Sequence, residues 1–226
     1  MKVAVIIPAY NEAPSISKVV NAIPLEINAT IIVVNNGSTD NTVEEATRAG
    51  AIVLDESRKG YGWACLKGIE YANEQQAEIM VFMDGDFSDF PSEMSILIDP
   101  IVAGKMDFVL GSRVLGERER GSLTPQQVFG NWLATRLIRI FYGARFSDLG
   151  PFRAIRSNTL NSLKMSDKTY GWTIEMQIKS AKMKLRFCEV PVSYRKRIGV
   201  SKVSGTLKGT VLAGIKIIWA VFKYRF

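Results

Sequence analysis

Short apolar runs rich in β-branched residues alternate with helical stretches through residues 1–110, and this alternation constrains the fold more than any other feature. Each run is nearly continuous, as is typical of strands buried on both faces. Strands that alternate with helices in this way form a parallel sheet, so we predict an α/β, Rossmann-like fold with helices on both faces. The predicted strands are Val3–Ile7, Thr30–Val34, Ala51–Leu54, Ile79–Met83 and Phe108–Leu110.

Residues that favour helix starts follow several of these runs. Pro14 and Pro91 suit the first turn of a helix, and Asp40 or Asn41 is expected to cap another. The second half of the chain is less regular. The other predicted elements are helices at Thr42–Ala49, Trp63–Asn73, Pro125–Tyr142 and Trp172–Met183, and a strand at Leu185–Tyr194.

Histidine is absent from all 226 residues, which excludes a Ser-His-Asp triad, a Cys-His pair and zinc sites built on imidazole. Any metal ion would therefore be held by oxygen atoms. There are two cysteines, Cys65 and Cys188, and the first residues do not resemble a secretory signal. We therefore expect a cytoplasmic protein.

Two carboxylates, Asp84 and Asp86, flank Gly85 directly after the fourth predicted strand. Ligands of such sheets bind beyond the carboxyl ends of the strands, and the glycine lets a ligand approach the backbone. Hard oxygen ligands suit Mg²⁺ or Mn²⁺, which would clamp a diphosphate. A calcium loop is excluded, because its sixth position is Asp89 rather than Gly and its twelfth is Ser95 rather than Glu.

Two other segments follow predicted strands, and each has two interpretations. Asn35–Asp40 is either a turn with a helix cap or a loop that presents Asn35 to a nucleotide base, because an amide oxygen can accept from a ring N–H. Gly60-Tyr61-Gly62 begins like a dinucleotide-binding fingerprint, but Cys65 replaces the third glycine and the segment follows the third strand. This argues against a nicotinamide enzyme.

Basic residues gather toward the C-terminus: residues 182–226 carry 11 Lys or Arg and one acid. Charge runs usually form a solvated face. Some basic residues, both in this region and earlier in the chain, lie on Gly- and Ser-bearing loops near the predicted ligand edge, and for these we favour contacts with phosphate instead. They are Arg113, Arg118, Arg120, Arg195–Arg197 and Lys202.

Several ordered motifs together resemble family-2 glycosyltransferases of the GT-A fold, and in particular the dolichyl or polyprenyl phosphate mannose and glucose synthases. The likeness covers almost the whole chain. The motifs are Ile7–Glu12, Asn36–Thr42, Met83–Asp86, Gly111–Arg113, Asp148–Arg153, Glu175–Met176, and Glu189–Val192 followed by Tyr194, Arg197, Gly199, Ser201 and Lys202.

The resemblance implies a nucleotide-sugar site, a metal site and a loop that closes on phosphate. Two positions depart from the family pattern: Asn35 stands where Asp is usual, and Ser88 stands where polyprenyl phosphate synthases usually carry Gln. The implied assignments are Pro8, Tyr10, Glu12, Asn35, Gly60, Asp84 and Gly85 for the nucleotide sugar; Asp84 and Asp86 for Mg²⁺ or Mn²⁺; Asp86, Glu175 and Arg197 for catalysis; and Arg113, Arg118, Arg120, Asp148, Arg197 and Lys202 for acceptor and phosphate.

The resemblance also implies an inverting transfer of a sugar from a UDP or GDP donor, with a polyprenyl phosphate as the expected acceptor. A phosphate acceptor is already an anion and needs no base, whereas a hydroxyl acceptor needs a carboxylate, with Glu175 or Asp148 as the candidates. A nucleotidyltransferase, a soluble hydroxyl acceptor and a non-catalytic nucleotide-sugar sensor remain alternatives. Binding of nucleic acid is not expected, because no aromatic-rich recognition motif accompanies the basic residues.

The end of the chain is apolar and basic. Residues 1–205 are predicted to form the GT-A domain, and residues 206–226 an amphipathic helix. That helix suits peripheral contact with the inner face of a membrane, although docking on the protein's own core explains it equally well. A transmembrane span of about 20 apolar residues is missing. The apolar face comprises Leu207, Val211, Ile215, Ile218 and Phe222.

Overall fold

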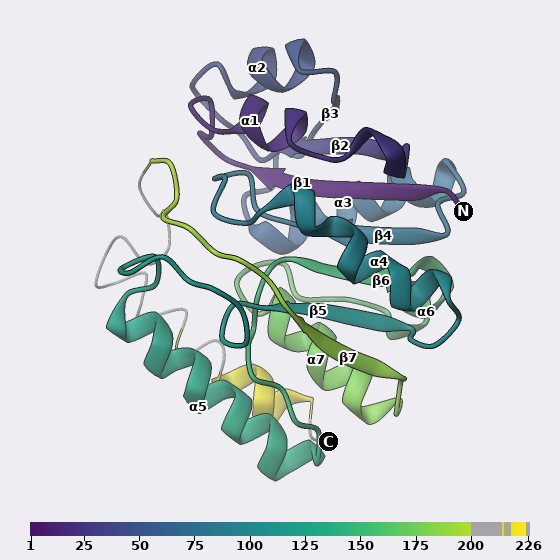
Figure 1. Ribbon diagram of the computed structural model, residues 1–226, viewed down its shortest axis with the longest axis vertical. Helices are drawn as coiled ribbons and strands as arrows, with labels where there is room; N and C mark the ends of the chain where they lie inside the picture. The colour runs from purple at the N-terminus through teal and green to yellow at the C-terminus, as the bar shows by residue number, and fades with distance from the viewer. Residues whose placement is uncertain (200–213, 215–217, 225–226) are drawn as a thin grey trace.

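A seven-stranded sheet forms the centre of the computed structural model, which describes residues 1–199, 214 and 218–224 (Figure 1). The strand order is β3-β2-β1-β4-β6-β5-β7. The five strands expected in the first half are all present, within one or two residues of their expected bounds. The strands are β1 (Val3–Ala9), β2 (Thr30–Asn35), β3 (Ile52–Asp55), β4 (Ile79–Phe82), β5 (Phe108–Ser112), β6 (Arg153–Arg156) and β7 (Phe187–Pro191).

Strand β6 runs antiparallel to both of its neighbours, whereas the other pairings are parallel. Its register places Ala154 opposite Val81 of β4 and Val109 of β5. The sequence did not predict this strand, because two of its four residues, Arg153 and Arg156, are charged. The sheet is therefore mixed, with mostly parallel strands.

Buried Arg153 explains how a charged strand can lie in the middle of the sheet. Its side chain is 1% exposed, and its guanidinium donates to the carbonyls of Gly150 and Thr173. Burial lowers the pKa of Arg153 to about 10. The arginine thus ties the segment before β6 to helix α7 (Trp172–Lys182), which lies beside the cavity described below.

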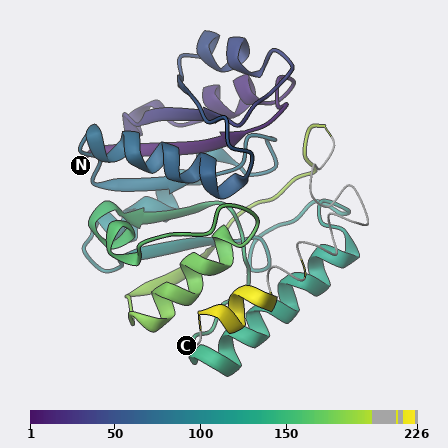
Figure 2. The same ribbon diagram turned by 180° about the vertical axis from the view of Figure 1, so that it is seen from behind.

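Helices cover both faces of the sheet, as predicted. Side chains of β1 alternate between two cores: Ile6 packs with residues of α3 and α7, and Val5 packs with residues of α1 and α4. In Figure 2, where the molecule is seen from the side opposite to Figure 1, α3 and α7 lie between the viewer and the sheet. The helices are α1 (Ile16–Asn21), α2 (Thr42–Arg48), α3 (Tyr61–Glu74), α4 (Met94–Val102), α5 (Pro125–Tyr142), α6 (Ser157–Leu163) and α7, with 3₁₀ turns at Leu25–Ile27 and Pro91–Glu93.

Local signals set several of the helix starts. The N-cap position of α2 is Asn41, whose side chain makes no capping bond, while the carboxylate of Asp40, one residue earlier, accepts from the backbone N–H of Thr42 at 3.1 Å. Pro91 opens the turn that leads into α4. At the start of α5, Thr124 and Gln127 form a capping box, in which each side chain accepts from the backbone N–H of the other.

The described part of the C-terminal segment, residues 218–224, lies against α5. Ala220 and Val221 are fully buried, and Tyr142 of α5 donates to the carbonyl of Val221. Ile218 and Phe222, which were expected on the buried or membrane-facing side, are 38% and 46% exposed. Within the described residues, no helix is long and apolar enough to cross a bilayer. Leu207, Val211 and Ile215 lie outside the described residues.

Two glycines allow α3 to begin against the backbone of residues 167–168. A Cβ atom at Gly60 would lie 2.2 Å from the carbonyl oxygen of Lys168, and one at Gly62 would lie 2.1 Å from that of Asp167. Both distances are far below van der Waals contact. The glycines of this segment therefore serve close packing between two loops.

We predict that Gly62→Ala lowers the free energy of unfolding by about 1–3 kcal/mol, because the added methyl group must push the two backbones apart. Gly130→Ala is the matched control: it also lies in a helix, and its Cβ would meet no atom within 4 Å. It should leave stability unchanged or raise it by about 0.5–1 kcal/mol. Urea denaturation measures both, and equal stabilities would contradict the packing argument.

Candidate functional site

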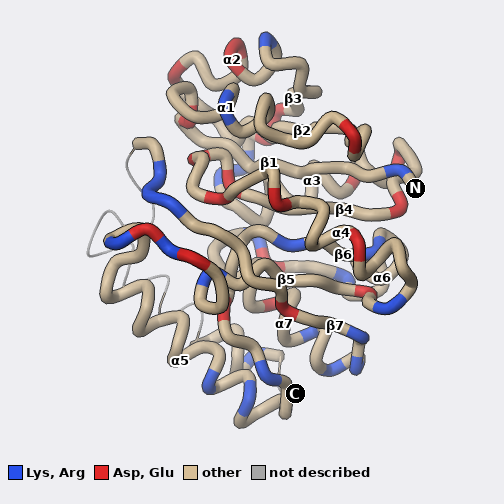
Figure 3. Tube along the Cα trace, viewed as in Figure 1, with Lys and Arg blue, Asp and Glu red and all other residues tan. Residues whose placement is uncertain are grey.

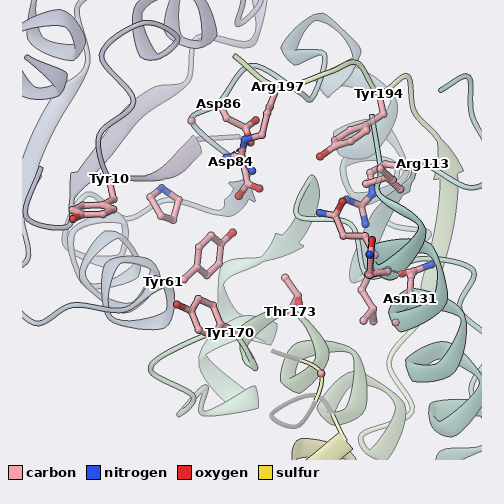
Figure 4. Close-up of a pocket in the computed structure, with 18 of the residues that line it drawn as sticks. Tyr10, Tyr61, Asp84, Asp86, Arg113, Asn131, Tyr170, Thr173, Tyr194 and Arg197 are labelled. Carbon is pink, nitrogen blue, oxygen red and sulfur yellow. Dashed lines mark hydrogen bonds and ion pairs between the residues drawn. The ribbon is translucent and has the colours of Figure 1, made fainter. Parts of the chain in front are cut away.

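A cavity of about 1120 Å³ opens where the parallel strands end (Figure 4). Tyr10 lies on one side of it, Arg113 lies on the other, and Asp84 and Asp86 lie between them with Arg197. Residues far apart in the sequence are thus brought together at the edge where the ligand was expected. The predicted site residues that line the cavity are Pro8, Tyr10, Glu12, Gly60, Asp84, Gly85, Asp86, Arg113 and Arg197.

Asn35, predicted to contact the base, does not line the cavity. Its amide group donates to Asp55 at 2.7 Å and accepts from the backbone N–H of Ser38 at 2.9 Å. The next residue, Asn36, does line the cavity. The Asn36 side chain donates to two carbonyls of residues 56–58 and accepts from the N–H of Gly60, so it holds the loop that begins α3.

Lys59 is a cavity residue that the sequence prediction missed. Its ammonium lies 5.2 Å from the centre of the Tyr10 ring, so a cation and an aromatic face meet on the β1 side of the cavity. The sequence feature that could have indicated it is the position of Lys59 in the loop Arg58–Gly62, directly after β3.

Asp84 and Asp86 meet at the end of β4, as predicted. Burial, and then the charge of Asp86, raise the pKa of Asp84 to about 7, although Arg197, Arg113 and a hydrogen bond from Tyr61 act in the opposite direction. Asp86 is 1% exposed, and its Oδ1 accepts from the N–H and hydroxyl of Ser88. Two like charges are therefore held close together in a poorly solvated place.

The donor set fits a hard divalent ion. Asp86 Oδ2 is buried, and its partner in the structure is the guanidinium of Arg197, 2.6 Å away, which stands where a cation would bind. The described residues contain no group of three or more Asp, Glu, Cys or His side chains that could hold a metal ion. Mg²⁺ is typically bound by one or two carboxylates together with phosphate oxygens of the substrate, and Asp84 and Asp86 suit that arrangement.

Arg197 stands beside these carboxylates. Its Nη2 lies 2.6 Å from Asp86 Oδ2 and 3.8 Å from Glu12 Oε1. The backbone around it is paired with the loop after β4: the N–H of Ile198 donates to the carbonyl of Asp86, and that of Arg195 donates to Ser88. The guanidinium thus partly neutralises the site where a metal ion is expected.

Arg195 has a different environment from its neighbour Arg197. Its guanidinium lies 3.5 Å from the centre of the Phe87 ring and 4.0 Å from that of Phe90. It also donates to the carbonyls of Phe87 and Asp89. Arg195 therefore anchors the loop that carries Arg197 to the loop that carries Asp86.

Arg113 and Asp148 form a buried ion pair on the far side of the cavity. The guanidinium donates to both carboxylate oxygens, at 2.8 and 2.7 Å, and the backbone N–H groups of Arg113 and Leu149 donate as well. Asp148 is fully buried, and Arg113 holds its pKa below the usual value despite that burial. Asp148 therefore positions Arg113, and a role as a base does not fit its environment.

Glu175 also differs from the sequence-based expectation. It is fully buried and does not line the cavity. It accepts from the backbone N–H groups of Ser166 and Asp167 and pairs with Lys179 at 2.7 Å. Burial opposes its ionisation, but the bonds from Lys179 and these residues lower its pKa overall. Glu175 fixes residues 166–167 to α7, and the structure does not bring this predicted catalytic residue to the cavity lining.

Two other predicted phosphate contacts, Arg118 and Arg120, are exposed and are not found in the cavity. Lys202 lies outside the described residues. Arg113 and Arg197 are thus the predicted arginines that the structure places in the cavity.

The α5 side of the cavity contains large apolar side chains beside the amides of Gln126, Gln127 and Asn131, which the sequence did not predict. Helix α5 contributes Phe129 and Leu133, and the C-terminal segment contributes Ile218. The other lining residues of α5 are Pro125, Gln126, Gln127, Gly130 and Asn131. Leu123, Leu149, Tyr170, Thr173 and Tyr194 also line the cavity.

A mostly parallel sheet with a cavity beyond its strand ends, two convergent carboxylates and two arginines defines an α/β protein built to bind phosphate-bearing ligands. The sequence matches the family model described as glycosyl transferase family 2 over residues 4–171. The chain belongs to this family and is a glycosyltransferase.

Two relatives illustrate the range of the family. Glycosyltransferase AglJ of Haloferax volcanii is 31% identical over 196 residues, which cover 86% of this chain and 63% of AglJ. The chain therefore spans slightly less than two thirds of that relative. The undecaprenyl-phosphate mannosyltransferase of Micrococcus luteus is 27% identical over 230 residues, which cover 95% of this chain and 93% of the relative.

A solved structure confirms the GT-A fold. Glucosyl-3-phosphoglycerate synthase from Mycobacterium tuberculosis, in complex with Mn²⁺, UDP-glucose and phosphoglyceric acid, superposes with a TM-score of 0.79. The match covers 99% of this chain and 79% of that one, at 21% identity. At this identity the likeness establishes the fold alone.

The raised pKa of Asp84 predicts a pH-dependent effect on stability. The folded protein holds the Asp84 proton more tightly than the unfolded chain, so the ionised group destabilises the metal-free fold increasingly from pH 3.8 to about 7. Asp84→Asn should therefore melt higher than the parent at pH 8, by roughly 3–10 °C, and equal to it near pH 4. Calorimetry without metal measures this, with Asp99→Asn as control because Asp99 is an exposed residue of α4; a gain independent of pH contradicts the prediction.

The ion pair between Arg197 and Asp86 predicts competition with metal. Without donor, Arg197→Ala should bind Mn²⁺ more tightly by roughly tenfold, equivalent to about 1.4 kcal/mol, because the ion no longer displaces a guanidinium. Lys196→Ala is the control, since Lys196 lies next to Arg197 on the same loop but pairs with Glu119 instead of Asp86. Free Mn²⁺ measured by electron paramagnetic resonance gives both constants. Equal affinities of parent and Arg197→Ala would show that the pair does not compete.

Proposed function

We propose that this glycosyltransferase moves a sugar, with inversion, from a UDP or GDP sugar onto a polyprenyl phosphate, with Mg²⁺ or Mn²⁺ as cofactor. One observation carries the proposal: a polar donor side with two carboxylates and an α5 side with large apolar side chains open into the same cavity. A nucleoside diphosphate sugar suits the first, and a lipid with a phosphate head suits the second.

The donor side suits a nucleoside diphosphate in size and chemistry. Tyr10 offers an aromatic face to a base, and Lys59 offers a cation beside it. Asp84 and Asp86 would hold the divalent ion, which neutralises the charge of the leaving diphosphate when bound. Arg197 would exchange its contact with Asp86 for the diphosphate, adding a second positive charge where negative charge develops.

Two observations favour a phosphate over a hydroxyl as the attacking group. Asp148 and Glu175, the candidate bases, are both buried in ion pairs with lowered pKa values. A phosphate oxygen needs no such base. Arg113 faces the cavity opposite the donor side and can bind the phosphate head.

A lipid acceptor is favoured over a soluble one by the apolar side chains of the α5 side and by the relatives. Phe129, Leu133 and Ile218 offer little to a small polar acceptor but suit an isoprenoid chain. The Micrococcus luteus relative, named for undecaprenyl phosphate, matches nearly the full length of both chains. Such an acceptor would bring the reaction to a membrane surface, for which we propose the inner, cytoplasmic face. A soluble phosphorylated acceptor and a nucleotidyltransferase remain the alternatives to test.

A panel of nucleotide sugars with Mn²⁺, with and without polyprenyl phosphate, tests the proposal. We expect a UDP or GDP sugar to yield a lipid-linked sugar and a nucleoside diphosphate, and EDTA to stop the reaction. Asp86→Ala should reduce the rate at least about 100-fold, because it removes a proposed metal ligand, whereas Asp99→Ala, at an exposed residue of α4, should leave the rate unchanged.

Other products would favour the alternatives. Release of pyrophosphate would indicate a nucleotidyltransferase, and full-rate transfer to a soluble phosphorylated hydroxyl compound would rule out the lipid acceptor. Full activity in EDTA would exclude the metal.

A further inference from the structure

The outward face of α5 is unusually apolar for a surface helix. Phe129, Trp132 and Ile140 are 61%, 56% and 65% exposed. They recur at three- to eight-residue spacing, so they lie on one face together with Arg136 and Arg139, which are also exposed. The helix contains no acidic residue.

The described C-terminal segment extends this face. Phe141 of α5 contacts Phe222 with ring centres 5.3 Å apart. Trp219 and Phe222 are about half exposed, and the ammonium of Lys223 lies 4.7 Å from the Trp219 ring. We call the surface formed by Phe129, Trp132, Arg136, Arg139, Ile140, Trp219, Phe222 and Lys223 the α5 surface.

Charge at this end of the molecule is positive. Figure 3 shows basic residues on α5, near the C-terminus and at the turn between α7 and β7. That turn carries Lys182 and Lys184, both exposed. No carboxylate of the described residues pairs with Arg136, Arg139 or Lys184, so these charges remain available to an anionic partner.

We infer that the α5 surface binds an anionic lipid surface and places the cavity mouth at the headgroups. Exposed aromatic side chains interspersed with arginine and lysine are typical of segments that lie in a membrane interface. Scattered single apolar residues would need no explanation, but a contiguous aromatic and basic face marks a contact surface. A peptide partner would be expected to find some acidic or amide groups here, and the exposed face of α5 presents chiefly apolar and cationic ones.

The cavity and the α5 surface are continuous. This step rests on the proposed function: docking on a membrane would bring a lipid acceptor to the cavity. Phe129 belongs to both the cavity and the α5 surface, and Leu133 and Ile218 line the cavity from the same two elements. A polyprenyl chain anchored in the bilayer would enter the cavity along these side chains. Docking by α5 would therefore present the acceptor end of the cavity to the lipid, while the donor end stays in water.

Vesicle binding tests the inference directly. The intact protein should co-sediment with phosphatidylcholine vesicles containing 30% phosphatidylglycerol (about one anionic lipid in three) and only weakly with phosphatidylcholine alone. Trp132→Glu combined with Ile140→Glu should reduce vesicle binding at least about tenfold, because two negative charges replace apolar side chains that would insert into the lipid interface. Neither residue lines the cavity. Leu25→Glu is the control, since Leu25 is 93% exposed in the turn between α1 and β2.

A second measurement locates the contact. Brominated lipids should quench the fluorescence of the intact protein, and Trp132→Phe should remove much of that quenching while binding persists. Thermal melts of all variants should match the parent, because the substituted side chains are exposed.

The outcomes separate this inference from the proposed function. Loss of vesicle binding in the double variant supports the α5 surface, even if no lipid-linked product forms with any donor. Normal transfer to a water-soluble short-chain isoprenyl phosphate by the same variant assigns the loss to docking rather than catalysis. Unchanged vesicle binding of the double variant overturns the inference. So does an intact protein that ignores anionic vesicles, including one that forms a dimer through this face.

Discussion

The close approach of two carboxylates at the end of β4 is the constraint on which the rest of the site depends. Asp84 and Asp86 are held where water is scarce, and their mutual repulsion and burial raise the pKa of Asp84 to about 7. Such a pair is unstable without a cation nearby. The fold supplies one from a distant part of the chain, Arg197, through the paired backbones of residues 86–89 and 194–198. The donor site is therefore formed by two segments separated by about half of the sequence.

The donor half could be predicted from the sequence because its signals are local. The apolar runs of β1 and β4 end in short polar motifs, and the carboxyl edge of a parallel sheet brings these motifs together whatever the rest of the fold does. Asp84 and Asp86 followed from that rule, whereas Tyr10 was expected from the family resemblance. Asn35 does not line the cavity because its amide is bonded to Asp55, its pairing partner on β3, while the next residue, Asn36, lines the cavity instead.

The acceptor half could not be predicted, because its arrangement depends on packing. Strand β6 is short and charged, and its antiparallel insertion between β4 and β5 is stabilised by Arg153, whose partners are carbonyl groups with no sequence pattern. Glu175 and Asp148 looked like candidate bases because sequence does not report ion pairs. Their ion pairs with Arg113 and Lys179 stabilise the ionised carboxylates and so make them weak proton acceptors.

The close contact of Gly60 and Gly62 with residues 167–168 links the two halves mechanically. Residues 166–167 are fixed by Glu175 to α7, and α7 carries Thr173 at the far wall of the cavity. The loop at the start of α3 and the cavity wall that contains Thr173 are thus joined through direct contacts. Substitutions in either loop are consequently expected to affect both sides of the cavity. A chimera that takes residues 56–62 from a relative needs residues 166–171 from the same relative, or the two loop backbones will no longer fit against each other.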